Sequence, residues 1–260
     1  MQCISPISIP RFGGKSNADR INVPCGRCIC CLQNRARSWS FRLEQELKNS
    51  CSAYFVTLTY SDEYLPIDNS VNKSDLQNFF KLLRYYYSKK IKYYAVSEYG
   101  ERLARPHYHA IIFGLPDYGV YELLEKSWKQ GFIKIGTVTP ASISYVTKYV
   151  IGKDQYPENT TPPFALMSKS LGNSYTTIHA TLCTDENKFY VTKQGGIKQS
   201  LPRYYSDKIF SPVAREQNAA RCAVLASKKS PNTIDEIRHS SLQKQELIRR
   251  KYAKKRQTIF

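Results

Sequence analysis

Four segments of the chain have the residue pattern of β-strands: 54–60, 92–99, 106–113 and 132–138. Each is rich in apolar, β-branched or aromatic residues, which favour extended backbone, and each lies between polar or glycine-containing segments. A short polar segment, residues 100–105, connects the second strand to the third. A connection this short predicts an antiparallel hairpin.

Four other segments have the character of amphipathic helices, with apolar residues at intervals of three and four. The first covers residues 31–49, and its apolar stripe consists of Leu32, Ala36, Trp39, Leu43 and Leu47. Its other faces carry basic residues at Arg35, Arg37, Arg42 and Lys48. These four side chains are expected to be solvated, with phosphate contact as the alternative.

The second helix is predicted to begin at Ser74, because Ser74-Asp75-Leu76-Gln77 has the Ser-x-x-Gln spacing of a capping box. Its buried stripe is expected to contain Leu76, Phe79, Phe80 and Leu83. A third helix-like segment covers residues 121–130 and ends at Gly131. These two helices therefore lie between the predicted strands.

The fourth helix is predicted to begin with Thr139 as the N-cap and Pro140 as the first helical residue. Tyr145 and Tyr149 are one turn apart on it, and Lys148 lies beside them. The two tyrosines lie roughly 110–150° from the centre of the inward stripe, at 100° per residue. A tyrosine placed for packing would fall inside that stripe, which consists of Ile143, Val146, Thr147 and Val150. The two tyrosines are therefore expected to face a partner other than the core.

The chain is predicted to contain three regions. Residues 1–52 combine a Cys-rich segment with the first amphipathic helix. Residues 53–155 contain the four strands and the three later helices, and residues 156–260 form a basic C-terminal region. A linker is expected at about 154–163, where Pro, Asn, Thr and charged residues replace the apolar pattern.

The C-terminal region is expected to contain a hairpin with its turn at Gly195-Gly196. It ends in a run of basic residues at 249–256. Such a run usually forms a solvated helix or a frayed tail, and a nonspecific phosphate-binding arm is the alternative.

The charge of the chain favours a polyanionic partner. Its 260 residues include 39 Lys and Arg against 21 Asp and Glu, which gives a net charge of +18. Its 20 tyrosines suit base stacking as well as phosphate contact. No segment is apolar enough to span a bilayer, and the N-terminus lacks the layout of a signal peptide, so a cytosolic protein without a membrane partner is expected. An anionic membrane surface is the weaker alternative.

Cysteines are concentrated near the N-terminus, which in a reducing compartment favours metal binding over disulfides. Cys25, Cys28 and Cys31 have Cys-x2-Cys-x2-Cys spacing, and Cys3 could complete a tetrahedral structural zinc site. Cys30 is an equally near substitute for one of these ligands. Free thiols in a small loop are the alternative to zinc.

His107 and His109 begin the third strand and share one of its faces, because side chains alternate across a strand. Imidazoles placed in this way can bind one divalent ion. Symmetric pairing of the hairpin places Glu98 opposite His107, which would complete a two-histidine, one-carboxylate site open to water and substrate. Glu101 replaces Glu98 if a bulge shifts the register. The alternatives are strand histidines bonded to neighbours and a surface ion pair between Glu98 and a nearby arginine.

This combination of side chains points to phosphoryl transfer on a nucleic acid. With Mg²⁺ or Mn²⁺ at the histidines, Tyr145 or Tyr149 would attack phosphorus, form a covalent phosphotyrosine and free a 3′ hydroxyl. Free tyrosine has a pKa near 10, so Lys148 or the metal ion would be needed to favour the phenolate. Alternatively, Lys148 would hold the substrate phosphate.

Three ordered motifs resemble those of rolling-circle replication initiators, the His-hydrophobe-His (HUH) endonucleases. They are Phe55-Val56-Thr57-Leu58-Thr59-Tyr60, His107-Tyr108-His109 and Tyr145-Val146-Thr147-Lys148-Tyr149. More narrowly, the chain resembles the replication initiation proteins of gokushovirus-like Microviridae through Pro24-Cys25-Gly26-Arg27-Cys28, Ser97-Glu98-Tyr99-Gly100-Glu101 and Pro202-Arg203-Tyr204-Tyr205. Tyr108 departs from the aliphatic residue usual between the histidines, at a position that faces away from the metal.

The resemblance implies an α+β fold with a central antiparallel sheet flanked by helices, the RRM- or ferredoxin-like palm of the HUH endonucleases. It also implies nicking of single-stranded phage DNA at the origin, 5′ attachment to one tyrosine and later rejoining, in the cytoplasm of a bacterial host and with a host replication helicase as a partner. The alternatives are a non-catalytic, sequence-specific nucleic-acid-binding protein and a metal-dependent nuclease that uses water. Fused ATP-driven helicase activity is not expected, because no glycine-rich phosphate loop is present.

Overall fold

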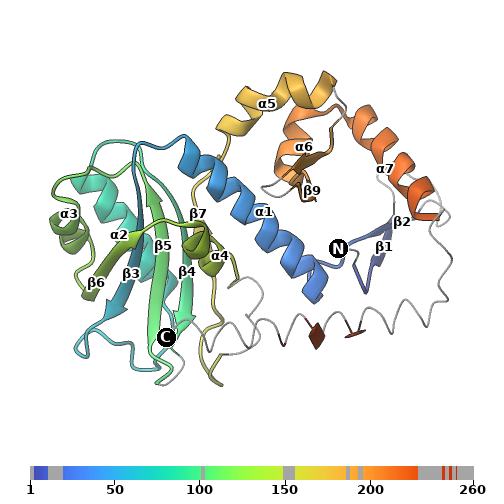
Figure 1. Ribbon diagram of the computed structural model, residues 1–260. Coiled ribbons are helices and arrows are strands. Elements are labelled where there is room, and N and C mark those ends of the chain that lie inside the picture. Colours follow the sequence, from blue (N-terminus) through green and yellow to red (C-terminus); the bar gives the residue numbers. More distant parts are fainter. Residues whose placement is uncertain are drawn as a thin grey trace. The chain divides into compact units, whose positions relative to one another are not determined.

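The computed structural model describes residues 3–10, 20–100, 103–148, 156–185, 188–192 and 196–227, together with 242–243, 246–247 and 250. They belong to two compact units. One unit contains residues 36–186, and the other contains residues 1–35 and 187–260. Figure 1 labels the helices and strands of both. The region boundaries expected at residues 52 and 155 stay a prediction.

A five-stranded antiparallel sheet is the centre of the unit that contains residues 36–186. Its strand order is β6-β3-β5-β4-β7. The strands are β3 (Ala53–Tyr60), β4 (Lys92–Tyr99), β5 (Pro106–Phe113), β6 (Gly131–Thr137) and β7 (Ala165–Met167). The four predicted strands and the predicted hairpin between β4 and β5 are confirmed, and β7 adds an edge strand that was not predicted.

Helices pack against both faces of this sheet, so the α+β class and the flanked antiparallel sheet are confirmed. The helices are α1 (Ile29–Lys48), α2 (Lys73–Tyr86), α3 (Val120–Ser127), α4 (Pro140–Lys148) and α5 (Ser174–Asp185). Side chains of α2 and α3 pack on one face with Leu58, Ala110 and Ile112. Side chains of α1 and α4 pack on the other face with Tyr94, Ile111 and Phe113.

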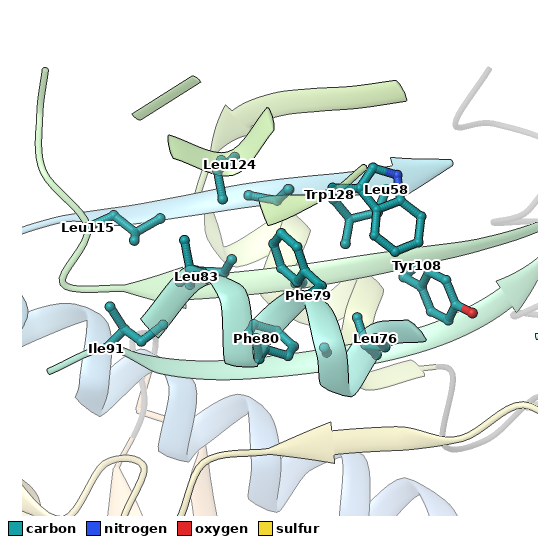
Figure 2. Packing of buried hydrophobic residues seen from close by; sticks show 14 of the residues in the cluster. Leu58, Leu76, Phe79, Phe80, Leu83, Ile91, Tyr108, Leu115, Leu124 and Trp128 are labelled. Carbon is teal, nitrogen blue, oxygen red and sulfur yellow. The ribbon is translucent and has the colours of Figure 1, made fainter. Parts of the chain in front are cut away.

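The stripe predicted for α2 forms the centre of the first core, as Figure 2 shows. Leu76, Phe79, Phe80 and Leu83 are each no more than 1% exposed. They pack against the sheet and against Trp128, which follows α3. Full burial of side chains this large stabilises the unit by roughly 1.5–3 kcal/mol each. This core holds β5 in place from the face opposite the histidines.

The first turn of α2 corrects the predicted capping box. The helix begins at Lys73, and its N-cap is Asn72, whose side-chain oxygen accepts a hydrogen bond from the Ser74 amide at 2.8 Å. Ser74 therefore lies inside the first turn. The physical reason is a tertiary contact, because the Tyr108 hydroxyl accepts from the Asn72 amide and donates to the Asn72 carbonyl, each at 2.8 Å.

Tyr108 lies fully buried between the two histidines but on the opposite face of β5. Its hydroxyl is also 2.6 Å from the Tyr60 hydroxyl, which donates to Asp75 on α2 at 2.7 Å. Burial raises the pKa of Tyr108 to about 12, so the phenol stays protonated and continues to donate. The tyrosine that departs from the family pattern thus ties the metal-facing strand to the start of α2.

The substitution Tyr108→Phe is expected to lower the free energy of unfolding by about 1–3 kcal/mol, because it leaves the Tyr60 hydroxyl and the Asn72 backbone with unsatisfied buried groups. Urea denaturation followed by circular dichroism measures the change. Tyr85→Phe is the matched control, since Tyr85 is 79% exposed. Equal stability of both variants would contradict the structural role of the Tyr108 hydroxyl.

The basic residues of α1 are only partly as expected. Arg35, Arg37 and Lys48 are exposed, but Arg42 is buried, so the expectation that it is solvated is wrong. Its Nε donates to the Leu171 carbonyl at 3.1 Å, and its guanidinium lies 4.1 Å from the ring centre of Trp39. A carbonyl acceptor and an aromatic face replace the water that the cation loses on burial.

The second unit contains two small antiparallel hairpins and two helices in its described part. The first hairpin joins β1 (Ile7–Pro10) to β2 (Arg20–Val23), and the second joins β8 (Tyr190–Thr192) to β9 (Lys198–Ser200). The second is the hairpin predicted around Gly195-Gly196, although Gly195 lies outside the described residues. The helices are α6 (Arg203–Ile209) and α7 (Pro212–Ser227).

The basic run at 249–256 lies outside the described residues except for Arg250. None of the helices in the described part of the chain has the length and the apolar character needed to cross a membrane.

Candidate metal and tyrosine site

Pairing of β4 with β5 brings three potential metal ligands together. Glu98 lies directly opposite His107, as the symmetric hairpin predicted, and His109 lies two residues further along the same face. The Nε2 atoms of His107 and His109 are 3.3 and 3.1 Å from Glu98 Oε2. The three residues offer ligand atoms that all lie within 4.8 Å of one another. Glu101, the substitute ligand, lies outside the described residues.

Each imidazole is oriented by a contact at its other nitrogen. Nδ1 of His107 lies 3.0 Å from the Arg105 carbonyl, which can only accept a hydrogen bond, so Nδ1 carries the proton. Nδ1 of His109 lies 3.0 Å from Oγ1 of Thr57 on β3. The Phe55 ring also stacks on His109, with ring centres 5.5 Å apart. These contacts direct both Nε2 atoms toward the carboxylate, as in metal sites where outer groups set the ring orientation.

Burial and charge have opposite effects on the two histidines. Burial lowers the pKa of His107, but the Glu98 carboxylate and the Arg105 carbonyl outweigh it, so the pKa lies above its usual value. At His109 burial is the stronger effect, and the pKa lies below its usual value. A metal ion needs a neutral imidazole, so His109 is ready to bind one, whereas a proton competes with the ion at His107.

This donor set fits a divalent cation such as Mg²⁺ or Mn²⁺ that must also contact a substrate. Two neutral imidazole nitrogens and one carboxylate oxygen occupy one side of such an ion and leave other coordination positions for water or phosphate oxygens. His109 is only 7% exposed, while the side chains of His107 and Glu98 are 18% and 16% exposed. The open side of the site therefore lies toward His107 and Glu98. The metal role of the three residues stays a prediction.

Tyr145 on α4 places its hydroxyl at this site. The hydroxyl oxygen is 3.3 Å from Glu98 Oε2, to which it donates, and 3.5 Å from His109 Nε2. The ring is edge-on to His109, with centres 5.2 Å apart. Ile143, Val146 and Thr147 are buried, as the predicted inward stripe requires, while Tyr145 is half-buried beside them. A nucleophilic oxygen and the ligand group thus lie within hydrogen-bonding distance.

The other two residues predicted around this site are known in less detail. Lys148 is half-buried and is the last residue of α4. Tyr149 and Val150 lie outside the described residues. The catalytic roles of Tyr145, Lys148 and Tyr149 stay predictions.

A second group of metal-ligating side chains lies in the other unit. Cys3, Cys25, Cys28 and Cys31 have sulfur atoms within 4.8 Å of one another. The Sγ of Cys3 is 3.5 Å from that of Cys25 and 3.8 Å from that of Cys28. Zinc with four bonds of about 2.3 Å places its sulfurs about 3.8 Å apart, so the spacing fits. Cys30, the substitute ligand, is buried and does not belong to the group.

Backbone amides support negative charge on this cluster. The Cys25 amide donates to Cys3 Sγ and the Cys28 amide donates to Cys25 Sγ, both at 3.3 Å. The amides of Cys28 and Arg27 lower the pKa of Cys25 to about 6, whereas burial raises the pKa of Cys31 to about 12. Metal binding would therefore have to displace protons, chiefly from Cys31.

The purified protein is expected to contain about one zinc ion per chain, and Cys28→Ser is expected to lower that content strongly, because a tetrahedral site loses a ligand. Elemental analysis of the dialysed protein measures the metal. Cys51→Ser is the matched control, since Cys51 is exposed and lies outside the cluster. Chelation that removes zinc without loss of fold or activity would contradict a structural role for the ion.

Comparison with known proteins identifies the family. The model of the replication-associated protein ORF2 family matches residues 53–155, which contain the sheet from β3 to β6 and the ligand group. The replication-associated protein ORF2 of Spiroplasma virus 4 is 30% identical over 217 residues, covering 72% of this chain and 68% of that protein. The chain belongs to the replication-associated protein ORF2 family. The resemblance to phage replication proteins that the motifs indicated is thereby confirmed.

Two further relatives support membership of the ORF2 family. The replication-associated protein ORF4 of Chlamydia phage 1 is 28% identical and aligns over 75% of this chain and 55% of its own length. The replication-associated protein VP4 of Bdellovibrio phage phiMH2K is 30% identical and aligns over 71% of this chain and 66% of its own length. Part of each relative, from about a third to nearly half, therefore has no counterpart in the alignment. No solved structure matches the chain.

Sequence reasoning did not find three contributors to the site of this ORF2 family member. Thr57 and Arg105 hold the two imidazoles, and Phe55 stacks on one of them. Phe55 and Thr57 alternate with buried Val56 and Leu58, which indicated that they share a face of β3. That signal could not assign them to the histidines, because the adjacency of β3 and β5 is a property of the folded sheet.

Proposed function

We propose that this chain initiates rolling-circle DNA replication by nicking and rejoining single-stranded phage DNA at its origin. Membership of a replication-associated family supports the process, and the site supports the chemistry. The observation that carries the proposal is the position of the Tyr145 hydroxyl, 3.3 Å from Glu98 Oε2 beside two histidines. A core tyrosine would be directed into the apolar stripe, whereas this one meets a potential ligand group.

In the proposed step, the Tyr145 oxygen attacks the scissile phosphorus. A bond forms between that oxygen and phosphorus while the bond from phosphorus to the 3′ oxygen breaks. The phenol loses its proton and the departing 3′ oxygen gains one, so the step is a transesterification without a net change in charge or oxidation state. The 5′ end of the DNA remains attached to the protein, which preserves the energy of the phosphodiester for rejoining.

His107, His109 and Glu98 would hold the Mg²⁺ or Mn²⁺ ion of the proposed reaction. When bound, such an ion polarises a phosphate oxygen and offsets charge on the leaving oxygen. Thr57 and Arg105 keep the imidazoles oriented, so the ligand atoms need little reorganisation when the ion binds. The ring of Tyr145 is held edge-on to His109 and Phe55, which limits the positions that its hydroxyl can take.

Rejoining is proposed to use the second tyrosine. Tyr149 follows Tyr145 by one helical turn in the sequence, so each could accept the strand that the other releases. Lys148 lies between them and is proposed to favour the phenolate or to hold the substrate phosphate. The cluster of Cys3, Cys25, Cys28 and Cys31 is proposed to hold a structural Zn²⁺ that organises the N-terminal segment.

The setting of the reaction follows from the same proposal. Single-stranded origin DNA is the substrate and becomes a covalent partner, and a host replication helicase is proposed to open the duplex ahead of the free 3′ end. Both would be encountered in the cytoplasm of a bacterial host.

The experiment that tests this function incubates the protein with single-stranded DNA carrying the replication origin of the genome that encodes it. Reactions with Mg²⁺, with Mn²⁺ and with EDTA are compared on denaturing gels. The proposal predicts metal-dependent cleavage, a free 3′ hydroxyl and DNA that stays on the protein after denaturation. A nuclease that uses water would release a free 5′ end, and a non-catalytic binding protein would leave the DNA intact.

A further inference from the structure

The face of the sheet that carries the histidines continues onto the neighbouring strands. Register pairing aligns Phe132 on β6 with Thr59 on β3, and aligns Thr59 in turn with His107 on β5. Residues paired across antiparallel strands point to the same side, so Phe132 and His107 share a face. They are two strands apart, or roughly 10 Å at about 4.8 Å per strand.

The next two rows repeat this arrangement. Lys134 pairs with Thr57, which pairs with His109, and Gly136 pairs with Phe55. The intervening residues of β6, Ile133 and Ile135, pack into the core on the opposite face, which is consistent with this assignment. We refer to Phe132, Lys134 and Gly136 as the β6 face.

The β6 face is open. Phe132 is 68% exposed, and Lys134 and Gly136 are exposed as well. β6 is an edge strand, and Figure 1 shows it on the side of the sheet away from α4 and β7. An extended aromatic ring next to a lysine, beside a strand position without a side chain, is an arrangement that leaves ring and cation accessible together.

Gly131 fixes where this face begins. Its φ is +152°, and a Cβ atom there would meet the backbone oxygen of Thr59 and the backbone nitrogen of Ser61 at 2.3 Å. Only glycine allows this close approach of β6 to β3. Phe132 therefore has a defined position at the start of the strand.

We propose that the β6 face binds single-stranded DNA next to the scissile phosphate, with a base stacked on Phe132 and a backbone phosphate at Lys134. This rests on the proposed function and adds the substrate contact on one side of its site. Base stacking on an exposed aromatic ring of a sheet, next to a cation, is a common way to bind single strands. The Phe55 ring, which stacks on His109, continues the aromatic surface between Gly136 and the ligand group.

Charge argues for DNA as the occupant. The chain has a net charge of +18, and the β6 face contributes a lysine and no acidic residue. A protein partner that added a strand to the β6 edge would use the backbone groups of β6 and would not need an aromatic ring on this face. A second copy of the chain would bring the same positive charge, which repels.

Phe132→Ala is expected to weaken binding of an oligothymidylate by about 5- to 100-fold, the range for losing one stacked base. Fluorescence anisotropy in EDTA measures the affinity without cleavage. Phe132→Trp is expected to retain binding, and Tyr85→Ala, which removes a 79% exposed ring from α2, is the matched control. Unchanged affinity in Phe132→Ala would overturn the proposal.

Two further variants separate the ring from the charge and from the space. Lys134→Gln is expected to lower the slope of log affinity against log salt by about 0.7, the value for one phosphate contact on a single strand. Gly136→Leu is expected to weaken binding by obstruction, because a Cβ there meets no atom nearer than 3.9 Å and the strand can accept it. An unchanged slope, or unchanged affinity in Gly136→Leu, contradicts the placement of the strand.

Photocrosslinking with an oligothymidylate that contains 5-iododeoxyuridine is expected to label the peptide that contains Phe132. Failure of this inference alone would leave covalent nicking intact, with normal affinity in Phe132→Ala and crosslinks elsewhere. Failure of the proposed function alone would leave crosslinking at Phe132 without any covalent adduct. If Phe132→Ala instead dissociates an oligomer in sedimentation velocity and leaves DNA affinity unchanged, the β6 face is a self-interface and the proposal is wrong.

Discussion

His107→Ala is expected to lower metal-dependent DNA cleavage by more than about 100-fold, since loss of outer partners of a metal ligand alone costs about 10- to 100-fold. His107 supplies one of the three ligand atoms that converge near Glu98, so its loss leaves His109 and the carboxylate to bind the ion. Single-turnover cleavage of single-stranded origin DNA, measured over a range of Mn²⁺ concentrations, gives the effect.

Binding of DNA by His107→Ala should remain within a few-fold of the unaltered protein, because the imidazole is not proposed to contact bases. His179→Ala is the matched control, since His179 packs on Tyr175 in α5 and not at the ligand group. Thr57→Val should give an intermediate effect through the orientation of His109. Full cleavage by His107→Ala would remove this histidine from the ligand set.

The double substitution Tyr145→Phe with Tyr149→Phe is expected to eliminate the denaturation-resistant DNA adduct. Phenylalanine keeps the ring of residue 145 against Phe55 and His109, so the variant loses the hydroxyl and little packing. Removal of both attacking oxygens leaves no side chain to form the phosphotyrosine. Denaturing gels of labelled DNA, with cleavage and adduct measured in the same lane, give the result.

The single variants show how the two tyrosines divide the work. Tyr145→Phe should lose one of the two transfer steps, so that nicking and rejoining are no longer coupled. Tyr121→Phe is the matched control, because Tyr121 lies on α3, whose side chains pack on the opposite face of the sheet. An adduct that persists in the double variant would show that another side chain attacks.

The hairpin of β4 and β5 could be predicted with its register because its signals are local. Both strands are eight residues long, and the connection between them is short. Symmetry about that connection was enough to place Glu98 opposite His107. The buried stripe of α2 was predictable for the same reason, since the helix period is expressed within a few turns.

Features that depend on distant parts of the chain could not be predicted. Asn72 replaces Ser74 as the N-cap of α2 because Tyr108, which is 36 residues away, holds its backbone. Arg42 is buried because the Leu171 carbonyl accepts from it, across 129 residues. A capping pattern and an amphipathic stripe contain no information about such partners.

The strand order of the sheet limited what could be predicted about the site. Thr57 and Phe55 reach His109 only because β3 lies next to β5, and the β6 face belongs to the same surface only because β6 lies next to β3. The edge strand β7 has three residues, too few to show a period. Residue types and spacing therefore identified the ligands, and the folded sheet added the groups that surround them.

The central claim is that a tyrosine of α4 or the residue directly after it becomes covalently attached to DNA. The most direct measurement is tandem mass spectrometry of the adduct formed on origin DNA with Mn²⁺, after digestion with nuclease and trypsin. The result expected is a nucleotide joined through its 5′ phosphate to Tyr145 or Tyr149. A modified peptide from any other part of the chain, or cleaved DNA with no modified peptide, would contradict the account.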